Sequence, residues 1–318
     1  MMSLIRPIAN LLAAAGLAGL GLIGAAALSG VGHRWVDILA QFTAPALAAA
    51  VAVTAACLAL RLWPAAATGT LAGLVLLIAA WPQWTPPQGR PAPGSPVVRV
   101  YSANLWARNT DVEAMRRSIV AADADIVILV ELGDAPAGRI DALLAGYPHR
   151  AIQRRVDRPS GAARSVIASR HPIRARLPEP ADGLSTIGAV VDTPLGPLNV
   201  FGVHLTRPWP FQYQWGQITQ VMALAERRRA APDLPVIAAG DFNSVSTARI
   251  GRQMKADMKL VPASGWPGTW PAVVPAFAGM TIDQVWRSPD LAILSRRLGR
   301  PTGSDHRPVV TEFARAAG

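Results

Sequence analysis

Three long apolar runs follow one another in the N-terminal part of the chain. They span residues 8–28, 38–60 and 62–81, and none contains a charged residue. Each run approaches the length of about 20 apolar residues with which a helix crosses a bilayer. A signal peptide is the alternative for the first run, but three runs in series favour a membrane domain of three transmembrane helices over residues 1–82.

The arginines around these runs predict the orientation of the chain in the membrane. Arg6 precedes the first run and Arg61 separates the second from the third, whereas Arg34 is offset by Asp37. Because cytoplasmic loops carry the excess of Lys and Arg, the N-terminus is expected in the cytoplasm. Three spans then deliver the rest of the chain to the other side. We expect a multi-pass protein of the bacterial inner membrane with a periplasmic soluble part.

The remaining residues form a basic soluble domain. Residues 83–96 are rich in proline and glycine, which predicts an extended linker between the membrane domain and residues 97–318. Residues 97–318 hold 27 basic and 19 acidic side chains, a net charge of +8, which favours nucleic acid or an anionic membrane face as partner. No protein partner is indicated.

Cys57 is the single cysteine of the chain, which excludes disulfides and cysteine-ligated metal sites.

One stretch of this domain combines a buried strand with polar side chains at its end. A short apolar run, residues 236–239, precedes Gly240, Asp241 and Asn243. In extended backbone Asp241 and Asn243 point to the same side, because they are two positions apart. An acid and an amide at the open end of a buried strand are typical of α/β active sites. The alternative is an Asx turn that only shapes the loop.

The same pattern of a strand followed by a polar residue recurs along the domain. Strands predicted at 97–104, 125–131 and 198–204 end in Asn104, Glu131 and His204, the strand at 281–286 carries Asp283, and a later loop carries Asp305 and His306. For Glu131 the alternative is the first polar residue of a surface loop. Carboxylates, amides and imidazoles without cysteine form a hard donor set that suits Mg²⁺ or Mn²⁺. Phosphoryl chemistry needs such a cation, a base for water and donors for the developing charge.

Helical spacing of apolar residues predicts helices over 111–122, with Asp111 as N-cap, over 136–145 and over 218–230. Two further segments bear on the substrate. An arginine-rich loop could track phosphates or be a solvated surface; it contains Arg150, Arg154, Arg155, Arg158 and Arg164. The segment 208–215 alternates aromatic residues, which could stack on bases, dip into the membrane or pack onto the domain.

Together these motifs resemble the endonuclease/exonuclease/phosphatase superfamily, which has the DNase I-like fold. The matching motifs, in the family's order, are the strand to Asn104, Asp125-Ile-Val-Ile-Leu-Val-Glu131, Val203-His204-Leu205, Gly240-Asp-Phe-Asn243, Ile282-Asp283 and Ser304-Asp-His-Arg-Pro308. The resemblance covers residues 97 to about 314. Tyr147-Pro148, Ser169-Arg-His-Pro172 and the apolar runs make the chain most similar to the membrane-anchored YafD-like branch.

The resemblance implies an α/β (α+β) architecture, in which three N-terminal transmembrane helices precede a four-layer α/β sandwich with two packed β-sheets over residues 97–318. It also implies roles for the residues above. Glu131 would be the principal ligand of Mg²⁺ (or Mn²⁺), with Asn104 beside it and Asp305 joining. Asp241 would hold or deprotonate the attacking water, Asn243 would bind the phosphate, and His204 would assist the leaving group. Asp283 would orient His306, which acts as base or on the phosphate. One metal or two are both compatible with the resemblance.

Two positions depart from the family's pattern: Val130 stands where Gln is usual, and Gln284 where many relatives have His or Tyr. The expected function is a membrane-anchored, Mg²⁺-dependent phosphodiesterase or nuclease that hydrolyses phosphodiester bonds by metal-assisted attack of water. The alternative is a phospholipid or sphingomyelinase-like headgroup phosphodiesterase. A catalytically silent membrane binding protein is the remaining hypothesis.

Overall fold

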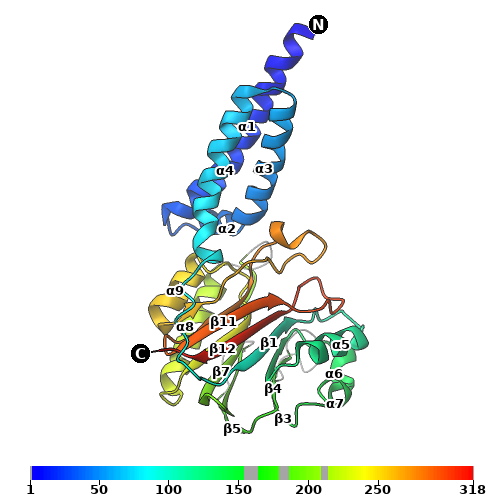
Figure 1. Ribbon diagram of the computed structural model, residues 1–318, viewed down its shortest axis with the longest axis vertical. Helices are drawn as coiled ribbons and strands as arrows, with labels where there is room; N and C mark the ends of the chain where they lie inside the picture. Colours follow the sequence, from blue (N-terminus) through cyan, green and yellow to red (C-terminus); the bar gives the residue numbers. More distant parts are fainter. Residues whose placement is uncertain (1, 154–163, 179–185, 209–213, 318) are drawn as a thin grey trace.

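The computed structural model describes residues 2–153, 164–178, 186–208 and 214–317 (Figure 1). The N-terminal helices α1 (Met2–Ser29), α3 (Thr43–Ala59) and α4 (Trp63–Trp84) form a bundle that extends away from the rest of the chain. The short helix α2 (Arg34–Ala40) lies at the end of the bundle next to the remaining domain. The N-terminus is at the opposite end of the bundle.

In the described residues, two helices are long and apolar enough to cross a membrane, α1 from Ile5 to Ser29 and α4. The expectation of three uninterrupted spans is therefore corrected. The middle run is divided between α2 and α3, which meet at an angle of 59° and make at most one broken span. Pro45 explains the break, because it has no N–H for the carbonyl of Gln41 four residues earlier.

The proline-rich segment after α4 is hydrogen-bonded along the domain. The backbone N–H of Ile293 donates to the carbonyl of Gln88 at 2.8 Å, and the N–H of Ala92 donates to the carbonyl of Arg315 at 2.8 Å. These bonds join the segment to strands β11 (Leu291–Leu298) and β12 (Val309–Arg315).

Two six-stranded sheets form the centre of the domain. The first has the order β11, β12, β1 (Val98–Asn104), β2 (Ile126–Val130), β4 (Ser165–Ser169) and β3 (His149–Gln153). The second has the order β5 (Ile173–Arg176), β6 (Thr186–Thr193), β7 (Gly196–His204), β8 (Val236–Asp241), β10 (Asp283–Arg287) and β9 (Val261–Pro262). Two pairs are parallel, β1 with β2 and β7 with β8.

Central strands such as β2 and β8 are buried on both faces, which accounts for their continuous apolar sequences. In β2, Ile126 and Ile128 lie in the core between the sheets, whereas Val127 and Leu129 pack under helices. Helices α5 (Val112–Ala122), α6 (Asp134–Gly138) and α7 (Ile140–Leu143) cover the first sheet, and α8 (Gln214–Ala230) and α9 (Arg249–Met258) cover the second. This is the expected four-layer α/β sandwich with two packed sheets.

One local prediction is confirmed, and the helices differ from the predicted ones in two places. Asp111 caps α5, since its carboxylate accepts a hydrogen bond from the N–H of Ala114 at 2.8 Å. The predicted helix over 136–145 is instead two short helices, α6 and α7, and α9 was not predicted. The aromatic residues at 209–213 and Arg154, Arg155 and Arg158 of the arginine-rich loop lie outside the described residues.

Candidate active site

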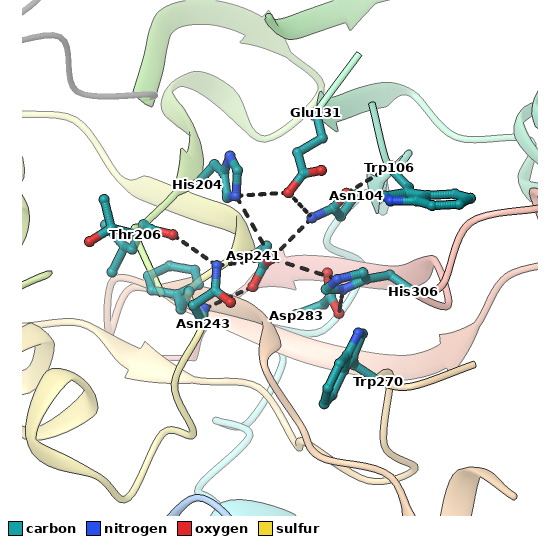
Figure 2. Close-up of polar contacts among 12 residues, drawn as sticks. Asn104, Trp106, Glu131, His204, Thr206, Asp241, Asn243, Trp270, Asp283 and His306 are labelled. Carbon is teal, nitrogen blue, oxygen red and sulfur yellow. Dashed lines mark hydrogen bonds and ion pairs between the residues drawn. The ribbon is translucent and has the colours of Figure 1, made fainter. Parts of the chain in front are cut away.

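The polar residues at the strand ends converge because of the register of the two sheets. Asn104 pairs with Val130 at the carboxyl ends of β1 and β2, which places Glu131 just beyond. His204 pairs with Asp241 at the ends of β7 and β8. Asp283 begins β10 directly opposite Asp241. The two sheets therefore bring these side chains to one rim of the sandwich (Figure 2).

Gly240 is required for this arrangement. It has a φ of +144°, and a Cβ at this position would lie 2.0 Å from the carbonyl oxygen of Val203 in the neighbouring strand. Glycine therefore permits the close approach of β8 to β7 that places Asp241 beside His204.

Glu131 and Asn104 form one side of the site. Glu131 Oε1 accepts a hydrogen bond from Asn104 Nδ2 at 3.1 Å and lies 3.1 Å from His204 Nε2. Asn104 Nδ2 also donates to Asp241 Oδ2 at 3.0 Å, so it bridges the two carboxylates. Glu131 has a φ of +51°, an uncommon conformation for a non-glycine residue. Its side chain is 16% exposed, which excludes an ordinary solvated loop residue.

The environment keeps Glu131 ionised. Burial raises its pKa, but the hydrogen bond from His204, the charge of His204 and the hydrogen bond from Asn104 outweigh burial and lower the pKa to about 2. Burial lowers the pKa of His204, and the hydrogen bond to Glu131 and the charges of Glu131 and Asp241 raise it above its usual value. Each member of the pair therefore favours the charged form of the other.

Asp241 and Asn243 form an Asx turn and also belong to the site. Asp241 Oδ1 accepts from the N–H of Asn243 at 2.8 Å, which is the local turn. Asp241 Oδ2 accepts from Asn243 Nδ2 at 3.2 Å and faces the other site residues. The amide of Asn243 also donates to the carbonyl of Leu205 at 2.8 Å. The Asx turn is therefore present, and the same carboxylate lies at the candidate site.

The pKa of Asp241 is raised to about 6. Burial is the largest cause; the charge of Asp283 acts in the same direction, while the charges of His306 and His204 oppose it. A carboxylate with a pKa near neutrality is suited to accept a proton from water at physiological pH.

Asp283 and His306 form a buried pair on the opposite side from Glu131. The distance between His306 Nδ1 and Asp283 Oδ2 is 2.8 Å, and His306 Nε2 lies 3.8 Å from Asp241 Oδ2. Burial lowers the pKa of His306, but the charges of Asp283 and Asp241 and the bond to Asp283 raise it to about 10. His306 is therefore a cationic donor at neutral pH.

Asp305 differs from the other predicted residues. Its Oδ2 accepts a hydrogen bond from Trp270 Nε1 at 3.1 Å. Among the described residues, the closely spaced ligand atoms that include those of Glu131 do not include those of Asp305. Within the described residues, Asp305 Oδ1 and Asp283 Oδ1 are buried oxygens without a hydrogen-bond partner.

The donor set fits a divalent metal. Two groups of three have ligand atoms within 4.8 Å of one another, Glu131 with His204 and Asp241, and Asp241 with Asp283 and His306. The groups contain the carboxylates of Glu131, Asp241 and Asp283, and carboxylate oxygens are donors that Mg²⁺ and Mn²⁺ take in proteins. The low pKa of Glu131 keeps its carboxylate available as a ligand at neutral pH.

Two tryptophans at the site were not predicted (Figure 2). Trp106 is 40% exposed and lies two positions after the end of β1. Its backbone N–H donates a hydrogen bond to Asn104 Oδ1 at 2.9 Å. The ring of Trp270 lies 6.4 Å from that of His306. Trp106 could have been suspected from its place beside Asn104, whereas no local signal distinguished Trp270 from an ordinary turn residue.

Comparison with known protein families gives a match over more than half of the chain. A sequence profile described as "Endonuclease/Exonuclease/phosphatase family" matches residues 101–306. No curated protein matches the chain.

Solved structures share the fold at low sequence identity. An endonuclease/exonuclease/phosphatase from Beutenbergia cavernae has 22% identity and a TM-score of 0.55, covering 70% of this chain and 72% of that one. A mannosyl-6-phosphatase from Bacteroides thetaiotaomicron has 17% identity and a TM-score of 0.54, covering 68% and 99%. The human nocturnin catalytic domain, solved with a bound sulfate anion, has 19% identity and a TM-score of 0.54, covering 73% and 99%.

Proposed function

The chain belongs to the endonuclease/exonuclease/phosphatase family and is a phosphoester hydrolase, and from this premise we propose that it works as a membrane-anchored enzyme dependent on a divalent metal ion. The observation that carries the proposal is the convergence of an ionised Glu131, a basic Asp241 and a cationic His306 at one rim of the sandwich. A binding protein without catalysis would not need these three perturbed groups together.

Glu131 and Asn104 would hold the metal, for which Mg²⁺ or Mn²⁺ are the candidates. Bound there, such an ion supplies Lewis-acid stabilisation of the non-bridging phosphate oxygens. Asp305 Oδ2 accepts the indole N–H of Trp270, whereas its Oδ1 has no partner among the described residues, so Oδ1 is the atom with which Asp305 would join as a ligand.

The chain's own residues carry the proton transfers and the charge. Asp241 accepts a proton from a water molecule, which attacks the phosphorus. The P–O bond to the leaving alcohol breaks, and the oxygen of this alcohol takes a proton from His204. His306, held by Asp283, donates a hydrogen bond to a phosphate oxygen as negative charge accumulates there. Asn243 orients Asp241 through its two hydrogen bonds to that carboxylate.

For the whole chain we propose residues 1–82 as membrane domain, 83–96 as linker and 97–318 as catalytic domain. The apolar helices α1 and α4, with α2 and α3 as a broken span between them, support membrane anchoring. The arginine pattern supports a cytoplasmic N-terminus in the inner membrane and a periplasmic catalytic domain. Phosphodiesters, in nucleic acid or lipid headgroups, are the proposed substrates.

The direct test is hydrolysis of bis(4-nitrophenyl) phosphate by the purified full chain in detergent micelles. We expect turnover that EDTA abolishes and Mg²⁺ or Mn²⁺ restores. Glu131→Gln should lower kcat/KM by about 100-fold or more, because a neutral amide is a weaker metal ligand than a carboxylate.

Glu113→Gln is the matched control, since Glu113 lies on α5 with a 48% exposed side chain that pairs with Arg116. This variant should keep wild-type activity. If the wild-type chain shows no EDTA-sensitive hydrolysis of this ester or of 4-nitrophenyl phosphate, the proposed function is wrong.

A further inference from the structure

A small apolar pocket opens directly beside the catalytic groups. Its volume is ≈ 190 Å³, and its lining includes Asn243 and His306 of the site. Trp270, Met280 and Ile282 form the wall on the domain side. Figure 2 shows Trp270 below His306, toward the blue N-terminal ribbon at the lower edge of the view.

The opposite wall comes from the N-terminal segment. Ile38 and Phe42, from α2 and the turn that follows it, complete the apolar lining. Asn243 and His306 of the site and the N-terminal segment, which are far apart in the sequence, therefore share one pocket.

Specific polar contacts hold α2 against the domain. Asp37 Oδ1 accepts a hydrogen bond from the N–H of Arg249 at 2.6 Å, and Asp37 Oδ2 accepts one from the side chain of Gln214. The end of α4 adds a second attachment, in which the buried side chain of Gln83 bonds to both Thr43 and Thr281 at 2.9 and 2.8 Å. The N-terminal wall of the pocket is therefore fixed to the domain by specific hydrogen bonds.

The size and chemistry of the pocket define its occupant. An engineered cavity of about 150 Å³ holds benzene, so this pocket can take a ring or a stretch of a few carbons. A polar group would lose its hydrogen bonds to water against these walls, whereas a hydrocarbon would gain from burial. The side chain of Gln41 is 6% exposed, and its Nε2 has no partner among the described residues, so Gln41 offers an unused donor in addition to Arg207 and the catalytic groups.

These features favour a lipid over a nucleobase. A base presents several donors and acceptors on its edge, and apart from Gln41, Arg207 and the catalytic groups the lining is apolar. An acyl ester presents a hydrocarbon and one carbonyl acceptor for Gln41. The pocket also lies at the end of the bundle where α2 turns into the apolar helix α3, next to the place where lipid would be in a membrane.

We infer that this pocket is a subsite for the hydrocarbon of a membrane lipid phosphoester, whose phosphate lies between Glu131 and His306. The inference rests on the proposed function and adds the substrate class. Ile38 and Phe42 would then determine specificity, although they belong to the membrane segment.

The test compares methyl and hexyl 4-nitrophenyl phosphate, which have the same leaving group and differ only in the hydrocarbon. With the full chain and Mg²⁺, the hexyl ester should have a kcat/KM about tenfold or more above that of the methyl ester. Phe42→Gln should bring this ratio close to one, because it replaces an apolar wall by a polar side chain. A variant that merely disturbs the catalytic groups would lower both values together and keep the ratio.

Leu39→Gln is the matched control on the adjoining helix α2, since Leu39 is 43% exposed and does not line the pocket. It should keep the wild-type ratio. A second measurement uses phosphatidylglycerol in nanodiscs, from which the wild-type chain should release a water-soluble phosphate ester or glycerol.

The outcomes separate the two proposals. No turnover of either ester would overturn the proposed function. Turnover with a wild-type ratio near one, or an equal ratio in Phe42→Gln and Leu39→Gln, would overturn the lipid subsite alone. Hydrolysis of a DNA or RNA oligonucleotide faster than both the hexyl ester and the nanodisc lipid would also overturn it and would assign the pocket to a nucleotide.

Discussion

At the scale of single residues, charged groups of the candidate site are buried, so water screens their interactions little. Asp241, Asp283 and His306 are all buried, and the two carboxylates share one imidazolium between them. Repulsion from Asp283 helps to keep Asp241 basic, while attraction to both carboxylates keeps His306 protonated. Asp283 therefore acts on both proton-carrying groups without touching the water.

This gives a prediction for the pH profile of Asp283→Asn. A base whose pKa is raised stays charged up to that pKa, so His306 of the wild-type chain remains a donor to about pH 10. Removing the charge of Asp283 lowers the pKa of His306, and the basic limb of the kcat/KM profile should move to lower pH. Initial rates between about pH 6 and 10 measure this shift. The control Asp290→Asn, at a 51% exposed carboxylate, should leave the limb in place. An unmoved limb in Asp283→Asn would show that His306 is not the group that titrates.

At the scale of helices and strands, contacts between residues close in the sequence could be predicted. Contacts between residues far apart in the sequence could not. The cap of α5 could be predicted because Asp111 and Ala114 are three positions apart. Helix α9 has no side-chain cap of its own, since its acceptor is Asp37, 212 positions earlier in the sequence. The same contact buries Asp37 of α2 against the domain, which composition alone could not show.

The contact between Asp37 and α9 makes a second prediction. Asp37→Ala removes an acceptor at the helix N-terminus, which costs about 1 kcal/mol and loosens α2 from the domain. Hydrogen exchange should show faster exchange at the amides of Arg249 to Arg252, at about five times the wild-type rate. Asp111→Ala is the control, because it should accelerate exchange at the start of α5 and leave α9 unchanged. Wild-type exchange at α9 in Asp37→Ala would mean that α2 does not hold this helix.

At the scale of the whole molecule, the sandwich and its site follow from strand ends that the sequence shows plainly. Seven of the eight predicted site residues lie at one rim, because polar residues after buried strands meet wherever parallel strands end together. The contact of Asp305 with Trp270 could not be predicted, because the two residues are 35 positions apart in the sequence. The pocket beside α2 could not be predicted at all, since it depends on how the N-terminal bundle sits on the domain (Figure 1).

This arrangement also predicts the topology. The N-terminus and the catalytic domain lie at opposite ends of the bundle, so they should be on opposite sides of the membrane. Alkaline phosphatase fused to the C-terminus should be active in a bacterial host, because that enzyme folds only in the oxidising periplasm. A fusion of the same reporter to the N-terminus should be inactive. The reverse result would place the catalytic domain in the cytoplasm.

The position of a bound metal tests the account most directly. Crystals of the full chain soaked with Mn²⁺ should show an anomalous-scattering peak at a coordination distance of roughly 2.1 Å from the carboxylate of Glu131, with the side chain of Asn104 beside it. Crystals of Glu131→Gln should lose this peak, and crystals of Glu113→Gln should keep it. A peak held by Asp241 and Asp283 alone, or no peak at the rim in the wild-type chain, would contradict the metal site at Glu131.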